Sequence, residues 1–492
     1  MNKKIAVIGA GFGGLTVACL LAKKGNKVTV FEKNSTIGGR ARMLEKDGFS
    51  FDMGPSWYLM PDTIEEIFNE LGYSTKDMLD LQRLDPNYKM FFDDEEIEIF
   101  EDMQKNYELF ERLEPGCSKK IEKYLKRAEY KYNVSMKYFI EKPFLSPTEL
   151  FEFKLLKESF KLDLFKSFGA YLDKEFKSDK LKKILGYTMV FLGGSPKNTP
   201  ALYSLITHSD FNLGVFYPKG GMTALAKALE KIAIDLGVEF VFDADIKKIN
   251  VENSVAKSIS YSQNQKDITF DQFDELIANA DYAHVEMNLL EEKYQSITKK
   301  QWEKKTIAPS GLILYLGIKG KIDNLRHHNL MIVNDWMQHF NEIFDDPRWP
   351  ENPSYYVCNP NKTENGLAPK DCENLFVLMP VAAGIEDDNE IREQYALKLI
   401  EDLEKRLGVN IKDNILVKEI YSQRNFLSDY NSYKGTALGL SQTLFQSAMF
   451  RPKNVSKKVS NLFFVGQYTN PGTGVPTTMI SGKIVSNLIS KK

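Results

Sequence analysis

Three glycines and one acid near the start of the chain have the types and spacing of a dinucleotide-binding site. Gly9, Gly11 and Gly14 form a Gly-x-Gly-x-x-Gly pattern, and Glu32 follows Gly14 by 18 residues (32 − 14). We expect Gly9 to permit a tight turn, Gly11 to let the backbone approach a pyrophosphate, and Gly14 to let a helix pack closely on a strand. A carboxylate at Glu32 can accept hydrogen bonds from ribose hydroxyls and disfavours a 2′-phosphate, so NADP is not the expected nucleotide.

The surrounding pattern predicts the elements that hold these residues in place. An apolar run at residues 4–8 precedes the turn, a helical stretch at 15–24 follows it, and a second apolar run at 28–31 leads to Glu32. This order is typical of a βαβ unit, and an isolated glycine turn would not require it. The N-terminus of the helix offers free N–H groups and a partial positive charge to phosphates.

The glycine turn alone leaves both NAD and FAD open. A second glycine turn ends at Gly39 and is followed by Arg40, whose guanidinium could bind a phosphate of a longer, extended cofactor. This extension resembles the large superfamily of FAD-containing amine oxidases and carotenoid desaturases.

Length and composition limit the possible classes of protein. A chain of 492 residues is too long for one compact core, so we expect two or three domains. The net charge is −2 and the lysines are interspersed with acids, so nucleic-acid binding is not expected. No apolar run is long enough to span a bilayer, and too few residues precede the first strand for a signal peptide, which predicts a cytoplasmic protein. The four cysteines and five histidines lack metal-ligand spacing, so neither disulfides nor a metal site are expected.

The middle of the chain has a helical pattern. Residues 109–142 are predicted to form helices that end at a Pro-Phe-Leu-Ser-Pro segment, and a shorter helix is expected at 61–71 with Asp62 as its cap. Residues 150–172 are amphipathic, with Leu150, Phe153, Leu156, Phe160, Leu164, Phe168 and Tyr171 at spacings of three and four beside Lys154, Lys157 and Lys161. Such a helix either packs on a core or lies on a membrane surface with its lysines facing anionic headgroups.

A strand–helix–strand pattern returns after this middle part. A turn at residues 217–221 opens a helix to 236, strands are expected at 238–246 and 276–281, and a last strand, loop and helix lie at 461–482. The predicted fold is therefore α/β with a discontinuous nucleotide-binding domain. The resemblance to FAD-containing amine oxidases implies that this is a Rossmann-like FAD-binding domain of the glutathione-reductase type. Its predicted ranges are 1–75, 217–298 and 455–492, and an inserted α+β substrate domain with a helical, membrane-facing region takes 76–216 and 299–454. Further strands are expected at 311–317 and 375–381, and a helix at 390–407.

Eight segments in this order and at these spacings resemble bacterial-type phytoene desaturases of the FAD-containing amine oxidase superfamily. They are the unit from Gly9 to Glu32, Gly39-Arg40, Asp52-x-Gly54-Pro55-Ser56, Pro143-Phe-Leu-Ser146, Tyr217-Pro-Lys-Gly220-Gly221, Asn279-Ala-Asp281, His327-His328-Asn329 and Pro471-Gly-x-Gly474-Val475-Pro476. The resemblance covers essentially the whole chain. One departure is Gly466-Gln467-Tyr468, where many members of that family carry small residues.

The resemblance implies FAD as the bound cofactor. The residues expected to contact it are Gly9, Gly11, Gly14, Glu32, Gly39, Arg40, Gly54, Pro55, Ser56, Ile246, Gly466, Gln467, Gly474, Val475 and Pro476. The segment at 52–56 is expected to lie against the flavin, although a strand that ends in a turn also explains its pattern. The N-terminus of the last helix is expected to face the electron-rich end of the flavin, where it would stabilise negative charge.

The resemblance also implies a reaction, the insertion of double bonds into a linear C40 or C30 isoprenoid by hydride transfer to flavin. Moving phytoene into water would cost on the order of 30 kcal/mol, at about 0.8 kcal/mol per CH₂, so the enzyme must take its substrate from a membrane surface through an apolar tunnel. We expect peripheral association with the inner face of the cell membrane, and oxygen or a quinone as the final electron acceptor. Glu149 is the candidate proton acceptor, and its alternative is an exposed acid in the first turn of a helix.

The same residues also allow other functions. The substrate could be C40 phytoene, giving neurosporene or lycopene, or C30 dehydrosqualene. A carotenoid isomerase or saturase, and an amine-oxidase-like or protoporphyrinogen-oxidase-like flavoenzyme, would use the same scaffold. A non-catalytic, membrane-associated flavin-binding protein would bind flavin without substrate-dependent reduction.

Overall fold

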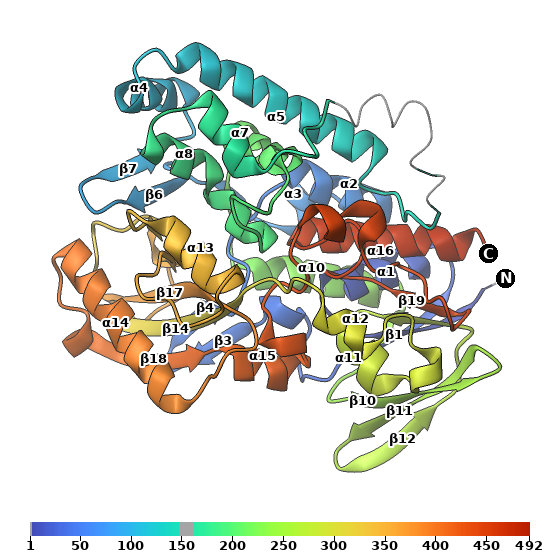
Figure 1. Ribbon diagram of the computed structural model, residues 1–492. Helices are drawn as coiled ribbons and strands as arrows, with labels where there is room; N and C mark the ends of the chain where they lie inside the picture. Colours follow the sequence, from blue (N-terminus) through green and yellow to red (C-terminus); the bar gives the residue numbers. More distant parts are fainter. Residues whose placement is uncertain (1, 147–148, 150–160) are drawn as a thin grey trace.

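A five-stranded parallel sheet organises the first half of the fold. The computed structural model describes residues 2–146, 149 and 161–492, and Figure 1 shows the course of the chain. The sheet has the order β19-β13-β1-β2-β9. Its strands are β1 (Lys4–Ile8), β2 (Lys27–Phe31), β9 (Glu239–Val241), β13 (Glu275–Ala278) and β19 (Leu462–Phe464), and every neighbouring pair is parallel. These strands come from three separate parts of the chain, but the predicted domain boundaries themselves stay a prediction.

Alternating side chains bury both faces of this sheet. Val7 and Val30 point into a core with helices, whereas Ile8 and Phe31 point into a core with a second sheet. The helices are α1 (Phe12–Lys23), α2 (Pro61–Leu71), α10 (Met222–Asp235) and α16 (Val475–Ser490). The second sheet is antiparallel and consists of β10 (Asp245–Glu252), β11 (Val255–Gln263) and β12 (Lys266–Phe270), at the lower right of Figure 1.

A seven-stranded mixed sheet organises the other half. In spatial order it consists of β18 (Ile415–Tyr421), β14 (Ser310–Lys319), β17 (Cys372–Val381), β16 (Tyr355–Cys358), β15 (His328–Met331), β6 (Tyr88–Phe91) and β7 (Glu96–Ile99). Along β14, Leu312 and Leu314 face α14 (Asn389–Leu407), while Ile313 and Tyr315 face a helical layer. That layer contains α4 (Met103–Leu113), α5 (Ser118–Tyr138), α7 (Phe168–Glu175) and α8 (Asp179–Gly186), drawn at the top of Figure 1.

Short pairs of strands and shorter helices join these layers. The pairs are β3 (Met43–Lys46) with β4 (Phe49–Asp52), and β5 (Leu81–Arg83) with β8 (Phe216–Pro218). The helices are α3 (Thr75–Met78), α9 (Leu205–His208), α11 (Tyr282–His284), α12 (Lys299–Glu303), α13 (Trp336–Phe344) and α15 (Gln423–Tyr430). No helix within the described ranges is both long and apolar enough to cross a membrane.

The helix predicted at 150–172 is wrong over residues 161–167 and is confirmed over residues 168–172, which belong to α7. Residues 150–160 lie outside the described residues, and residues 161–167 form turns rather than a helix. The chain becomes helical only at α7, which Ser167 caps. Phe168 and Tyr171, expected on the membrane-facing side, are buried against the seven-stranded sheet and its helices. Phe168 and Tyr171 therefore pack on the core, which was the other interpretation of this pattern.

Other predicted elements are confirmed with small corrections. The strands predicted at 311–317 and 375–381 are β14 and β17, and the helix at 390–407 is α14. One predicted element, a strand, is divided. The strand at 238–246 is β9 and β10, because the chain leaves one sheet for another at Asp243, whose φ is +54°. The helical stretch at 109–142 is α4 and α5, separated near Gly116, whose φ is +81°.

The cap predicted for α2 is also wrong. The helix begins at Pro61 after Met60, whose φ is +55° and whose side chain makes no capping hydrogen bond. Asp62 lies in the first turn, and its carboxylate accepts a hydrogen bond from the Tyr132 hydroxyl at 2.9 Å. A proline at the first position has no N–H to satisfy, so this helix can begin without a side-chain cap.

Candidate active site

The glycine turn lies at the carboxyl end of β1, between that strand and α1. Gly9 has a φ of +98°, and Gly11 is the N-cap of α1, which begins three residues earlier than predicted. A Cβ atom on Gly14 would lie 2.0 Å from the Gly9 carbonyl oxygen, so only glycine allows the helix to pack this closely on the turn. This arrangement leaves the N-terminus of α1 open toward a cavity.

Glu32 is held at the same edge of the sheet. It directly follows β2, is buried, and lines the cavity. Its carboxylate accepts hydrogen bonds from the backbone N–H groups of Ala10 at 2.7 Å and Asn34 at 2.9 Å. Asn34 Nδ2 also donates to Oε1 at 2.9 Å, so Oε2, which accepts from Ala10, is the oxygen that keeps a lone pair for a hydroxyl donor of a ligand.

The second glycine turn packs against the segment that contains Gly54. Gly38 and Gly39 have φ values of +99° and +56°, and the Arg40 guanidinium donates hydrogen bonds to Gln467 Oε1 and, at 3.1 Å, to Ser432 Oγ. Arg40 Nε and Gln467 Nε2 are buried donors without a hydrogen-bond partner among the described residues. Such orphaned donors beside a cavity fit a polar cofactor.

The last helix begins beside the glycine turn, since a Cβ atom on Gly13 would lie 3.2 Å from the Thr478 carbonyl oxygen. The N–H of Gly466 donates to Ser481 Oγ at 2.7 Å, which ties the loop after β19 to α16. Gly474 is the N-cap of α16 with a φ of +123°, and Pro476 lies in the first turn. The first residues of this helix line the cavity, so the positive end of its dipole points toward a ligand.

One cavity of about 930 Å³ joins these pieces. The predicted cofactor residues that line it are Gly9, Gly11, Glu32, Gly39, Arg40, Gly54, Pro55, Ser56, Ile246, Gly466, Gln467, Gly474, Val475 and Pro476. Gly14 does not line it and instead permits the close packing of α1. Four parts of the chain that are far apart in sequence thus meet around a space whose glycine-lined walls fit an extended dinucleotide.

The cavity continues from the glycine turns into an apolar region. Trp57 follows the Gly54-Pro55-Ser56 segment and stacks on His328 with ring centroids 4.0 Å apart. Its indole also contacts the aromatic rings of Tyr187, Phe191 and Tyr356. Beyond these rings the wall is formed by Phe139, Ile140, Phe144, Leu162, Leu164, Leu202, Ile206, Leu330, Ile332, Phe340, Phe376, Leu444 and Phe450. An apolar chain, rather than a charged group, suits this region.

Sequence reasoning missed several residues that line the cavity. Asn279 directly follows β13, and its Nδ2 donates to the Gly9 carbonyl oxygen at 3.2 Å. Its place after a parallel strand could have indicated this position, because carboxyl ends of parallel strands meet at one edge. Asp429 and Tyr430 at the end of α15, and Gln442, also line the cavity, and their local sequence carries no such signal.

Glu149, the candidate proton acceptor, is not among the cavity-lining residues. Its carboxylate accepts a hydrogen bond from the Ser146 N–H at 3.0 Å, and its side chain is partly exposed. Its role in proton transfer stays a prediction.

Two buried acids near the cavity have unusual pKa values. Burial raises the pKa of Asp52 to about 7, although its carboxylate accepts hydrogen bonds from the N–H of Met222 at 3.0 Å and of Thr223. Asp52 thereby holds the N-terminus of α10. Burial likewise raises the pKa of Asp210 to about 7, and its Oδ2 accepts hydrogen bonds from two tyrosine hydroxyls.

One buried group brings potential metal ligands together. A ring nitrogen from each of His327 and His328 and the Cys358 sulfur lie within 4.8 Å of one another. Nδ1 of His327 hydrogen-bonds Thr363 Oγ1 at 2.7 Å, and Nδ1 of His328 hydrogen-bonds the Tyr356 hydroxyl at 2.6 Å. Hydrogen bonding thus accounts for one nitrogen of each ring. The absence of a metal site stays a prediction.

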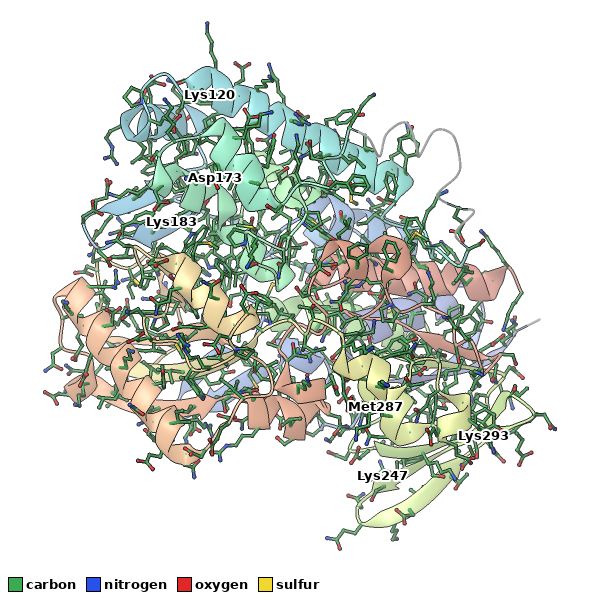
Figure 2. The ribbon with its side chains drawn as sticks, in the orientation of Figure 1. Lys120, Asp173, Lys183, Lys247, Met287 and Lys293 are labelled. Carbon is green, nitrogen blue, oxygen red and sulfur yellow. The ribbon has the colours of Figure 1, made fainter. Side chains whose placement is uncertain are left out.

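Lysines on the outer surface are paired with acids. Lys120 contacts Glu114, Lys247 contacts Asp245, and Lys293 contacts Glu291. Figure 2 labels these lysines, with Lys120 at the top of the view and the other two at the lower right. Their positive charge is balanced locally.

Comparisons with known proteins agree with this geometry. Residues 12–490 match a family model described as flavin containing amine oxidoreductase. The carotenoid 3,4-desaturase of Haloarcula japonica is 41% identical over 486 residues, which cover 98% of this chain and 97% of the relative. The 4,4'-diapophytoene desaturase (4,4'-diaponeurosporene-forming) of Staphylococcus haemolyticus is 32% identical over 497 residues, with 98% and 97% coverage.

Solved structures share the fold at low identity. An oxidoreductase from Methanosarcina mazei superposes with a TM-score of 0.63 at 17% identity, covering 99% of this chain and 100% of that one. Putrescine oxidase bound to putrescine has a TM-score of 0.60 at 16% identity, with full coverage of both chains. The chain therefore belongs to the flavin containing amine oxidoreductase family and, within it, to the carotenoid desaturases.

Proposed function

We propose that this chain is an FAD-dependent desaturase that introduces double bonds into a linear C40 carotenoid precursor. The observation that carries the proposal is that one cavity is lined both by the glycine turn at Gly9 and by an apolar region that includes Phe450. A dinucleotide and a long hydrocarbon can therefore meet inside the same space. Phytoene, converted to neurosporene or lycopene, is the substrate that the sequence predicts.

FAD is the cofactor, and in our proposal the glycine turns, Glu32 and the N-terminus of α16 hold it. Bound FAD supplies the oxidant that accepts a hydride from an allylic carbon. The neighbouring carbon loses a proton, and the electron pair of that C–H bond becomes the new π bond. The apolar wall around Trp57 positions the hydrocarbon chain of the substrate and excludes water. A delocalised allylic cation needs this positioning and a low dielectric more than it needs a nucleophile.

The acceptor of that proton is open. Glu149 stays our candidate from the sequence, and its carboxylate would need to turn from Ser146 toward the cavity to act. Turnover that survives Glu149→Gln would remove it. Oxygen or a membrane quinone would be the final electron acceptor.

Exposed apolar side chains at the end of the cavity support peripheral membrane association. We name Leu145, Phe165, Phe445 and Phe450 the mouth patch, and they are 43%, 85%, 74% and 49% exposed. Three of them directly follow cavity-lining residues, since Leu145 follows Phe144, Phe165 follows Leu164 and Phe445 follows Leu444. The Lys453 ammonium joins the segments of Leu145 and Phe450 by donating to the carbonyl oxygens of Phe144 and Met449, the residues that precede them.

The mouth patch would let the substrate pass from a bilayer into the cavity without crossing water. Lys161 and Lys166 are exposed in the same segment as Phe165, and Lys166 also pairs with Asp163 at 3.8 Å. In our proposal both ammonium groups would contact anionic headgroups. The inner face of the cell membrane is the surface that we propose. In this account residues 76–216 and 299–454 form the substrate-binding and membrane-associated domain, inserted into the FAD-binding domain of residues 1–75, 217–298 and 455–492.

A second candidate function is desaturation of carbons 3 and 4 in an already conjugated carotenoid. The relative with 41% identity carries that reaction in its name, whereas the relative with 32% identity is named for a diapophytoene substrate. A C30 substrate and a carotenoid isomerase or saturase remain alternatives. The amine-oxidase-like, protoporphyrinogen-oxidase-like and non-catalytic flavin-binding functions are less well supported by an apolar cavity.

The test is to incubate FAD-loaded protein with phytoene in liposomes, with oxygen or a quinone present, and to record the visible spectrum of the extract. A structured polyene spectrum would support phytoene desaturation, and its band positions would give the number of steps. A colourless extract, together with a red shift when a conjugated carotenoid is supplied, would favour 3,4-desaturation. No change with any C40 or C30 polyene would refute the proposal.

A further inference from the structure

Arg451 is a buried cation whose hydrogen-bond partners are all neutral. It is only 2% exposed and follows a short 3-10 helix at Ala448–Phe450. Its Nε donates to the Thr469 carbonyl at 3.0 Å, and its Nη2 donates to the Gln467 carbonyl at 2.6 Å. Its Nη1 donates to Gln442 Oε1 at 2.6 Å and to the Gln446 carbonyl at 2.9 Å. Among the residues that the structure describes, no carboxylate forms an ion pair with it.

The charge of Arg451 is therefore not compensated by its protein surroundings. Burial lowers the pKa of Arg451 to about 10, so the guanidinium is still protonated at neutral pH. Its titratable neighbours are Tyr203, Tyr468 and Lys305. Burial, and then the charge of Arg451, lower the pKa of Lys305. Proteins rarely bury a cation without an anion, because the lost hydration is not replaced.

Arg451 lies directly behind one wall of the cavity. Gln467 and Gln442, both of which it contacts, line that wall. A Cβ atom on Gly472 would lie 1.9 Å from Gln442 Nε2, so Gln442 packs against the loop that leads to Gly474 and the N-terminus of α16. The buried cation and the positive end of the helix thus act on the same part of the cavity.

We propose that Arg451 raises the reduction potential of the bound FAD by stabilising the negative charge that reduction places against the wall of Gln467 and Gln442. The inference rests on the proposed placement of FAD beside this loop. Taking a hydride from a hydrocarbon needs a strong oxidant, and a fixed cation without a protein partner stabilises the reduced form of the cofactor at no reorganisation cost. Arg451 acts through the wall, so it is a positioning residue rather than a catalytic one.

The test compares midpoint potentials of FAD-loaded variants, measured by equilibration with a reference dye. Arg451→Met removes the charge, and we expect the ratio of reduced to oxidised flavin at a fixed potential to fall about tenfold, which is ~30 mV for a two-electron couple. Arg451→Lys keeps the charge and should stay close to the unmodified protein. Arg392→Met is the matched control, because Arg392 is also buried and also donates to a backbone carbonyl, that of Ile420, in β18.

A second variant keeps the guanidinium and its backbone contacts. Gln442→Glu places a carboxylate where Oε1 now accepts from Arg451. The midpoint potential of the flavin should therefore fall as it does in Arg451→Met. This variant tests the inference if Arg451→Met does not fold. An unchanged midpoint potential in Gln442→Glu, or an equal fall in Arg451→Lys and Arg451→Met, would overturn the inference. Arg451 would then have only a structural role. The potential is measured without a polyene. A polyene that fails to reduce the flavin would therefore refute the proposed function separately.

Discussion

A Cβ atom on Gly54 would lie 2.4 Å from the carbonyl oxygen of Arg40. The two segments are 14 residues apart (54 − 40), and each was predicted to contact the cofactor on its own. Their close packing makes them one wall of the cavity, in which Arg40 also binds Gln467 from the opposite end of the chain. The conformation of this wall therefore depends on the absence of a side chain at Gly54.

Gly54→Ala should weaken FAD binding at least tenfold, because the new methyl group must push the Arg40 backbone away from its position. The dissociation constant can be measured by the change in flavin fluorescence on binding. Gly408→Ala is the control, since Gly408 has a φ of +67° but no atom near its missing side chain. That variant should lose stability and keep its FAD affinity, and equal FAD affinity in both variants would contradict the account.

Glu32→Gln should also weaken FAD binding, by roughly tenfold. An amide oxygen can replace only one of the two carboxylate oxygens that now accept from Ala10 and Asn34, and it accepts ribose hydroxyls less strongly. Titration of the apoprotein with FAD checks this. Glu275→Gln changes another buried acid of the same sheet, one paired with Lys3 at 3.0 Å, and should leave FAD affinity unchanged.

Replacing Phe165, Phe445 and Phe450 by Ser should reduce binding to liposomes that contain anionic lipid. These side chains form most of the mouth patch, and their burial in the acyl region is the expected source of membrane affinity. Co-flotation of protein with liposomes measures the bound fraction. The control replaces Ile234 and Leu416 by Ser, because these side chains are 58% and 55% exposed elsewhere on the molecule, and it should keep liposome binding. If the triple variant and the double control variant bind liposomes to the same extent, the mouth patch does not face the membrane.

Asp210→Asn should change how the stability of the protein depends on pH. The pKa of Asp210 is raised from 3.8 to about 7 in the folded state, so the folded protein holds a proton that the unfolded chain releases. The contribution of Asp210 to the free energy of unfolding is therefore complete below pH 4 and is lost as the pH rises through 7. The loss between pH 5 and pH 8 is roughly 3 kcal/mol. The amide still accepts from Tyr88 and Tyr187 but cannot ionise. Urea unfolding should show the variant gaining relative stability at pH 8, whereas parallel pH curves would disprove this.

Local pattern was enough to predict the parts of the site that lie within one stretch of chain. The glycine turn, Glu32 and the start of α16 each follow from short-range chemistry, and they line one cavity. Long-range partners could not be predicted in this way. Asp52 holds the N-terminus of α10 from 170 residues away, and no local signal connects the two.

Periodicity alone also could not tell a core helix from a membrane-facing one. Phe168 has the spacing expected of an exposed apolar face, yet it is fully buried because the helical layer folds back over the seven-stranded sheet. The exposed residues of the mouth patch come instead from a turn, at Phe165, and from short 3-10 helices, at Phe445 and Phe450, which are too short for a periodic pattern to indicate them.

The most direct test of the central claim is an anaerobic mixing experiment with FAD-loaded protein and a linear polyene in liposomes. The absorbance of oxidised flavin should disappear while the conjugated polyene absorbance rises, with one new double bond for each FAD reduced. Flavin that stays oxidised with every C40 and C30 polyene tested, or that is reduced by amines instead, would contradict that claim.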